Sequence, residues 1–524
     1  MEEIQYLTTI EKILAQHRAF GDSDYIHRRL QVTYQRRLSK ISARLPTAGA
    51  VLDRLCRTDA YNRYRVIGDT VVRCAIDDAL RQIEMQTHRG LTLAQCEQVF
   101  RAILQYFDDG KSEGPLGFGC AKVNRLGREA YRGWIWSEEH YGDVFDRVLR
   151  RTIQECCGQL CGPETALCTP TDEEVSMLEK GALLLGELLP LLSRSALRHT
   201  HLIAVFPSAA WKGAASLSQF WLGGTIFLGR EFLQSPWWVA EHLLHESLHQ
   251  KLYDFHHGHS LLEPDFSREG SPKVCSLWNA PGTNNSNLWD THRAVAAFHV
   301  YVHLALLSTM AEERAPELEK AYGPASGKPG MIDSRRAMER ARFLGEQIKE
   351  LCWQELGLAG KRLIEWLISV LNALDSQPPP RGAYIHLLLD RYRGEAQMAA
   401  KKAQSWLIDG RTERFASEIP IATDFTQQLM KLVKGEIECA RCALSGVDAA
   451  DDLRRFNTAI KEYSDEELGT KFFQVRALIS TAISNLCPNG YGSGSFTRGW
   501  EPIVNEMIEA SSVKLQKIMA GQTV

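Results

Sequence analysis

Residues 235–255 read Ser235-Pro-Trp-Trp-Val-Ala-Glu-His-Leu-Leu-His-Glu-Ser-Leu-His-Gln-Lys-Leu-Tyr-Asp-Phe255, and this stretch predicts a helix. Ser235 can accept a hydrogen bond from a first-turn N–H group, and Pro236 suits the first helical position because its missing N–H has no intrahelical partner there. Apolar residues then recur at helical spacing, and neither Gly nor a second Pro interrupts them.

The motif His245-Glu246-Ser-Leu-His249 lies in the middle of this predicted helix. His245 and His249 are one turn apart, so both imidazoles leave the same face and can meet on one metal ion. Glu246 is placed to reach a metal-bound water rather than the metal itself. A polar surface helix that binds nothing is the alternative, but nine of the chain's sixteen histidines fall between positions 242 and 303, which favours a metal site.

A second helix is expected over residues 289–307, and its strongly apolar composition predicts that it is buried. It nevertheless carries Arg293, His299 and His303, and the two histidines share one face because they are four positions apart. Buried imidazoles need polar partners. We therefore expect His303, or His299 in its place, to be the third ligand of a metal held by the HExxH motif. The less favoured source is the loop group His256, His257 and His259.

Composition narrows the possible partners and the location. The chain has 524 residues, a net charge of −3, 44% hydrophobic and 24% charged residues, which together describe a globular protein with no broad nucleic-acid footprint. The N-terminal residues do not resemble a signal peptide, and no apolar run reaches the length that spans a bilayer. These features predict a cytoplasmic protein without a membrane partner, whose cysteines stay reduced.

Three segments are expected along the chain: a helical region over residues 1–175, a metal-binding core over 176–310, and a second helical region over 311–524. Two strand candidates, 201–206 and 219–228, precede the HExxH helix. The predicted fold class is mainly α and multi-helical, with a small β-sheet next to the HExxH helix, an order of elements that resembles zinc peptidases (a zincin-like core). The edge of such a sheet can accept an extended peptide as an added strand.

Residues 245–254 and 289–304 together resemble the HExxH-motif proteins that accompany ribosomally made, post-translationally modified peptides. This resemblance implies an Fe(II)- and α-ketoglutarate-dependent enzyme that hydroxylates the β-carbon of a residue in a precursor peptide. It also implies that His245 and His249 are iron ligands and that a third ligand comes from the downstream helix. Oxygenases of this cofactor class usually combine two histidines with a carboxylate, whereas here the third ligand looks like histidine, which leaves iron and zinc both open.

Three mechanisms follow from these residues. In the hydroxylase, Arg293 binds the distal carboxylate of α-ketoglutarate, although an ion pair with Asp290 at the helix start is an equally good role for it. In a zinc metallopeptidase, Glu246 is the general base that deprotonates the metal-bound water. In a peptide-binding helical protein, the four histidines 245, 249, 299 and 303 close a structural metal site.

Overall fold

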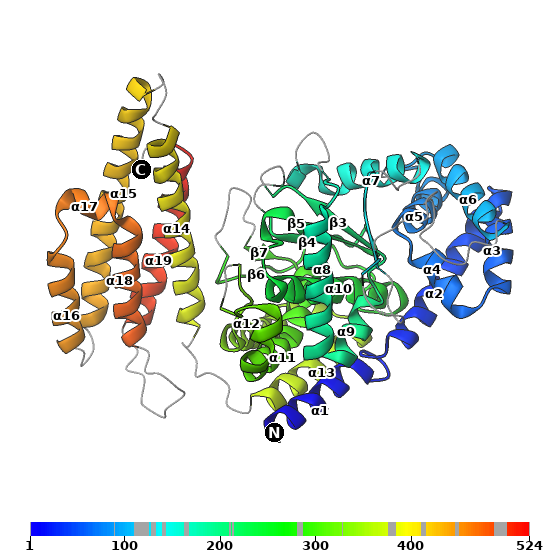
Figure 1. Cartoon of the computed structure of the whole chain (residues 1–524), viewed down its shortest axis with the longest axis horizontal. Helices are drawn as coiled ribbons and strands as arrows, with labels where there is room; N and C mark the ends of the chain where they lie inside the picture. Colours follow the sequence, from blue (N-terminus) through cyan, green and yellow to red (C-terminus); the bar gives the residue numbers. More distant parts are fainter. Residues whose placement is uncertain are drawn as a thin grey trace. The chain divides into compact units, whose positions relative to one another are not determined.

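The computed structural model describes residues 2–87, 90–108, 125–126, 133–138, 143–161, 167–208, 211, 214–279, 287–326, 329–375, 384–409, 415–445, 450–486 and 500–522 (Figure 1). The predicted mainly α class is confirmed, with one small mixed sheet placed next to the HExxH helix. The chain forms two compact units. Unit 1 comprises Met1–Phe266, Val295–Ala341 and Trp353–Leu374, and unit 2 comprises Ser267–Ala294, Arg342–Cys352 and Asp375–Val524. These units do not follow the three segments expected from the sequence, because the chain leaves unit 1 after the HExxH helix and returns to it within the next long helix.

The helices of unit 1 surround the sheet and the HExxH helix. They are α1 (Glu2–Gln16), α2 (Ser23–Ser42), α3 (Pro46–Arg57), α4 (Ala60–Gly68), α5 (Thr70–Met85), α6 (Leu93–Asp108), α7 (Asp143–Cys161), α8 (Asp172–Leu188), α9 (Pro190–Leu197), α10 (Pro236–Gly258), α13 (Leu358–Leu374), and most of α11 (Thr291–Tyr322) and α12 (Ser334–Gln347). Side chains cap several of them: Asp22 begins α2, Asp69 begins α5, and Thr171 forms a capping box with Glu174 at the start of α8.

Five short strands form the sheet of unit 1: β1 (Arg125–Leu126), β2 (Gly133–Ile135), β3 (Leu202–Phe206), β4 (Ser216–Ser218) and β5 (Thr225–Gly229), in the spatial order β1-β2-β3-β5-β4. The inner strands β2, β3 and β5 are parallel, and both edge strands are antiparallel to their neighbours. Every residue of β3 and β5 is buried, as is usual for parallel strands covered on both faces.

The strand predictions are partly confirmed. β3 falls within the first predicted run, and β5 overlaps the second but ends one residue beyond it. β4 lies just before the second run, and β1 and β2 come from the predicted N-terminal helical region. Runs of two or three residues are too short to show a strand period, so only pairing with β3 defines β2 as a strand. Most of residues 111–141 lie outside the described residues.

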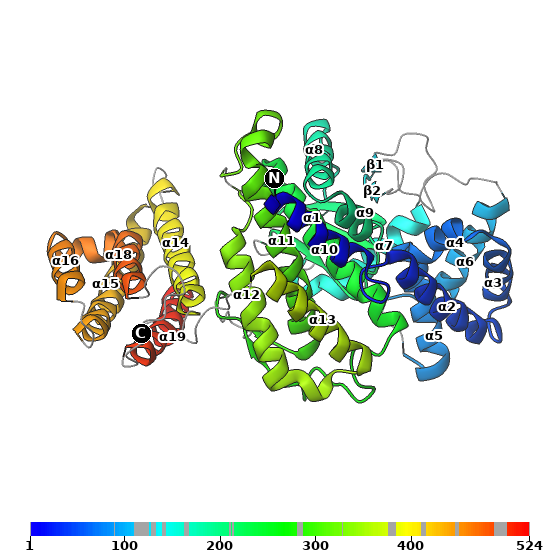
Figure 2. The same cartoon turned by 90° about the horizontal axis from the view of Figure 1, so that it is seen from below.

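Helix α10 begins where the sequence predicts, with Pro236 in its first turn, but Ser235 makes no capping hydrogen bond. Gln250 fixes the helix to the sheet: its side-chain amide donates to the carbonyl oxygen of Thr225 at 2.8 Å and accepts from the N–H of Gly224 at 2.7 Å. From Val295 onward, α11 lies next to α10 in both views (Figures 1 and 2). Among the described helices, α11 alone is long and apolar enough to cross a membrane, yet 83% of its most apolar window is buried, so its apolar surface is covered by protein.

Unit 2 contains a two-stranded ribbon and a helical bundle. Its elements are β6 (Val274–Cys275), β7 (Leu288–Trp289), α14 (Ile385–Asp409), α15 (Phe415–Ser445), α16 (Ala450–Lys461), α17 (Asp465–Thr470), α18 (Phe472–Asn485) and α19 (Glu501–Met519). Inside the bundle, Arg476 and Glu436 form a fully buried ion pair at 2.6 Å, to which the hydroxyl of Tyr392 also donates. Every cysteine that the structure describes, in either unit, is a free thiol.

Candidate metal centre

Helix α10 is buried along almost its whole length. The side chains on it that are not fully buried, apart from the terminal Gly258, are all histidines: His242, His245, His249, His256 and His257. His242, His245 and His249 fall on one face, because they are spaced three and four positions apart. A helix enclosed by protein thus opens to solvent along a single line of imidazole rings.

The predicted HExxH group is formed. Ligand atoms of His245, Glu246 and His249 all lie within 4.8 Å of one another, and the His245 and His249 rings meet edge to face with their centroids 5.0 Å apart. The Glu246 carboxylate is buried, lies 4.0 Å from Nε2 of His245, and accepts a 2.6 Å hydrogen bond from the hydroxyl of Ser216 on edge strand β4. Two imidazoles and a carboxylate therefore converge at a partly open position beside the sheet edge.

Burial favours the neutral form of His242 and His245. Desolvation lowers the pKa of His245, opposed by the neighbouring Glu246, and lowers the pKa of His242 to about 3. Nδ1 of His242 lies 3.0 Å from the carbonyl oxygen of Trp238, which can only accept, so the ring hydrogen is on Nδ1 and a lone pair is on Nε2. Neutral imidazole with a free lone pair is the form that binds a transition metal.

The histidines of α11 are buried as predicted, with 2% of His299 and 1% of His303 exposed, and their rings are 4.6 Å apart. Neither belongs to the group of ligand atoms around the HExxH motif, so the four-histidine closed site is not formed in this geometry. They are nevertheless close to it: desolvation chiefly lowers the pKa of His299, and the charges of His303, Lys251 and His249 lower it further.

The hydrogen bonding of His303 is that expected of a metal-binding histidine. Its Nδ1 donates to the carbonyl oxygen of His299 at 2.7 Å, and its buried Nε2 has no hydrogen-bond partner in the part of the chain that the structure describes. Nδ1 of His299 is likewise buried and has no hydrogen-bond partner among the described residues. A metal-binding histidine commonly has this arrangement, in which one nitrogen is fixed by a carbonyl and the other points to the ion.

Arg293 was expected to be buried beside the histidines, and this expectation is wrong. It is exposed, it belongs to unit 2, and its guanidinium lies 5.1 Å from the centre of the Trp289 ring. Its backbone N–H donates to the carboxylate of Asp290, which therefore caps the start of α11. Position 293 falls in the first turn of the helix, before the chain enters the interior of unit 1, and a long cation at such a position extends into solvent.

A second group, His27, His199 and Asp254, also places its ligand atoms within 4.8 Å of one another. Asp254 is fully buried and forms a 2.6 Å ion pair with Arg73, which is only 2% exposed. The fixed guanidinium charge already neutralises this carboxylate and disfavours a divalent cation beside it. We interpret this group as a structural polar network.

The same network contains a Ser–His–Asp sequence of contacts. The Ser23 hydroxyl lies 3.0 Å from Nε2 of His199, and Nδ1 of His199 lies 2.6 Å from Asp254. All three residues are at most 4% exposed, and the Ser23 hydroxyl donates to the carbonyl oxygen of Ser195. A nucleophile must reach its substrate, so these contacts connect α2, α9 and α10 rather than carry out catalysis.

Sequence reasoning missed two residues that lie next to the centre. His242 is three positions before His245, and this spacing was itself a usable signal for the same helix face. Ser216 had no such signal, because only the pairing of β4 with β5 brings its hydroxyl to Glu246.

No known protein family and no curated protein matches this chain. The resemblance to HExxH peptide hydroxylases therefore rests on the residues of α10 and α11 alone.

Proposed function

We propose that this chain is a metal-dependent, peptide-modifying enzyme whose metal is held by His245 and His249. The observation that carries the proposal is the convergence of His245, His249 and Glu246 on α10, a helix whose only partly exposed side chains are histidines. A helix buried on its other sides gives such ligands a fixed geometry, as a catalytic site requires. The Nε2 lone pair of His303, or Nδ1 of His299, is the source of a third nitrogen ligand if the side chain reorients toward the ion.

Within this class, we favour an Fe(II)- and α-ketoglutarate-dependent hydroxylase acting on a ribosomally made precursor peptide. His245, His249 and a third histidine would leave open positions on Fe(II) for a 2-oxo acid cosubstrate. When bound, iron and α-ketoglutarate supply the oxidant that removes hydrogen from the β-carbon of a peptide residue. Ser216 holds the Glu246 carboxylate in place, and the buried surroundings of α10 limit the access of water. Exposed Arg293 gives this cofactor assignment no support, so the resemblance carries it.

The second candidate is a zinc metallopeptidase. It is favoured by the position of Glu246, whose carboxylate lies beside both histidines and next to the edge strand β4. In that case Glu246 accepts a proton from the attacking water, and β4 holds the scissile segment as an added strand. A cytoplasmic location is part of either proposal, and the free thiols of the described cysteines support it.

Metal analysis of anaerobically purified protein, combined with succinate release from α-ketoglutarate, separates these candidates. We expect about one metal ion per chain in the wild type and a loss of at least tenfold in metal affinity in His245→Ala and His249→Ala. His259→Ala, which removes a partly exposed histidine just beyond the same helix, is the matched control and should keep its metal. Iron-dependent succinate release supports the hydroxylase. Peptide cleavage with zinc and no cosubstrate, abolished by Glu246→Gln, supports the peptidase instead, and normal metal content in both alanine variants would overturn the metal centre.

A further inference from the structure

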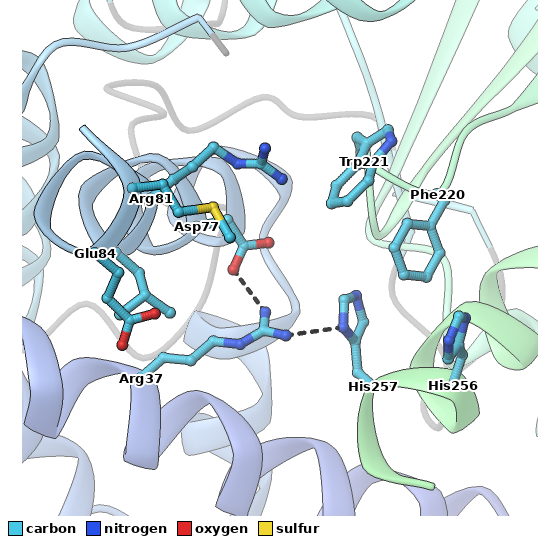
Figure 3. Close-up of a pocket in the computed structure, with 10 residues that line it drawn as sticks. Arg37, Asp77, Arg81, Glu84, Phe220, Trp221, His256 and His257 are labelled. Carbon is cyan, nitrogen blue, oxygen red and sulfur yellow. Dashed lines mark hydrogen bonds and ion pairs between the residues drawn. The ribbon is translucent and has the colours of Figure 1, made fainter. Parts of the chain in front are cut away.

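A cavity of about 400 Å³ lies between α2, α5, the chain that follows β4, and the C-terminal end of α10 (Figure 3). The residues that line it are Arg37, Asp77, Leu80, Arg81, Glu84, Met85, Phe220, Trp221, His256 and His257. A cavity of this size accommodates a large side chain together with its neighbouring polar groups. None of these residues belongs to the metal centre.

One wall of the cavity is aromatic. Phe220 stacks on His257 with ring centroids 4.8 Å apart and lies 5.1 Å from His256, while Trp221 extends the same wall (Figure 3). Nδ1 of His257 accepts from the guanidinium of Arg37 at 3.2 Å, because a guanidinium can only donate, so the hydrogen of the neutral ring is on Nε2. The wall thus offers flat rings and an N–H donor.

The opposite wall is charged and carries one uncompensated cation. Arg37 pairs with Asp77 at 2.6 Å, and Glu84 pairs with Lys40 at 2.8 Å, so these four charges cancel. Among the described residues, Arg81 has no carboxylate within ion-pair distance, and its guanidinium lies 5.3 Å from the centre of the Trp221 ring. The net positive charge of this wall therefore favours an anionic ligand group next to the aromatic wall.

The cavity and the metal centre lie at the two ends of one stretch of the structure, formed by residues 216–220 and the C-terminal half of α10. Ser216 contacts Glu246 at the metal centre, and Phe220, four residues further along, contacts Tyr253 and His256 near the end of α10. The ten residues from 246 to 256 rise about 15 Å along a helix, which is about the length of four residues of an extended peptide. A peptide extended along β4 would reach both places.

We propose that this cavity binds an anchor segment of the substrate peptide, formed by an aromatic side chain adjacent to a carboxylate, about four residues from the residue presented to the metal. The aromatic ring packs against Phe220 and Trp221, and the carboxylate pairs with Arg81. That the ligand is a peptide rests on the proposed function, whereas the preference for an aromatic ring beside a carboxylate rests on the cavity alone.

The test is a binding measurement on the full, metal-free chain in EDTA, so that it does not depend on catalysis. Fluorescein-labelled hexapeptides containing Phe–Asp, Phe–Asn, Ala–Asp or Phe–Lys are titrated and followed by fluorescence anisotropy. We expect Phe–Asp to bind at least about tenfold more tightly than the other three. Arg81→Gln should remove this advantage of Phe–Asp over Phe–Asn, whereas the matched control Arg36→Gln, which removes an exposed charge from α2, should retain it.

The comparison between peptides distinguishes recognition from general damage to the fold. The proposal would be overturned if Arg81→Gln lowered the affinity for Phe–Asp and for Phe–Asn equally. It would also be overturned if the wild type showed no saturable binding of Phe–Asp up to millimolar concentration. Tighter binding of Phe–Lys would assign the cavity to cations through Asp77 and Glu84 and would also overturn it. Failure of the metal proposal would appear separately, as an absence of bound metal in a chain that still binds the Phe–Asp peptide.

Discussion

Replacing Glu241 with glutamine should stabilise the protein at alkaline pH and have much less effect at acidic pH. Glu241 lies on α10, one turn before His245, and only 6% of it is exposed. The N–H of Ile332 donates to its carboxylate at 2.6 Å, a hydrogen bond that the carbonyl oxygen of glutamine can also accept. Burial raises the pKa of Glu241 from 4.5 to about 7, opposed by the Ile332 hydrogen bond and by the charge of Arg340.

The sign of the effect follows from the raised pKa. The folded protein prefers the protonated carboxyl, so the contribution of Glu241 to stability is fully present below about pH 4.5 and is lost as the pH rises toward about 7. A difference of about 2.5 pKa units between the folded and unfolded states corresponds to about 3 kcal/mol. Glutamine carries no charge at either pH. The stability gain of Glu241→Gln over the wild type should therefore grow by about 2 to 3 kcal/mol between about pH 5 and about pH 8.

Urea denaturation at these two pH values, followed by tryptophan fluorescence, measures this difference. Glu313→Gln, which replaces an exposed carboxylate on α11, is the control and should change stability by less than about 0.5 kcal/mol at both values. A stability difference for Glu241→Gln that is the same at both pH values would refute the reasoning, because it would mean that Glu241 is not held in its protonated form by burial.

Two further predictions concern the packing that fixes α10. Asp254→Asn should lower the free energy of unfolding by about 3 to 5 kcal/mol, because it leaves the guanidinium of Arg73 buried without a counter-charge; a loss below about 1 kcal/mol in urea denaturation would contradict this. Gly181→Ala should cost about 1 to 3 kcal/mol, since the added methyl group would lie 2.3 Å from a side-chain carbon of Val239. Gly186→Ala on the same helix has no atom within 4 Å of the added methyl group and should stabilise by up to about 1 kcal/mol, so equal effects of the two substitutions on the thermal midpoint would contradict the packing argument.

The convergence of His245, Glu246 and His249 could be predicted from the sequence because it needs only local geometry. Residues four apart on an α-helix face the same way whatever surrounds them, and a helix start with Pro236 is equally local. The burial of His299 and His303 was predictable for a similar reason, since a long apolar helix must be covered by protein.

How separate helices pack against one another could not be predicted from the sequence, because it depends on the tertiary structure. Whether α11 brings its histidines among the ligand atoms of α10 depends on how the two helices pack, and the spacing within each helix does not contain that information. Arg293 was assigned to the interior because its helix is apolar, but its place in the first turn sets its exposure.

What the sequence by itself determined is the histidine-bearing face of one helix and the mainly α class, both of which follow from short-range periodicity. Three features were decided only by the tertiary structure. The histidines are the only partly exposed side chains of α10 before Gly258, Ser216 donates a hydrogen bond to Glu246, and a cavity lies at the C-terminal end of α10. The physical reason is that burial and cavities arise where elements distant in the chain meet. Contacts of this kind are set by packing as a whole rather than by any local pattern of residues.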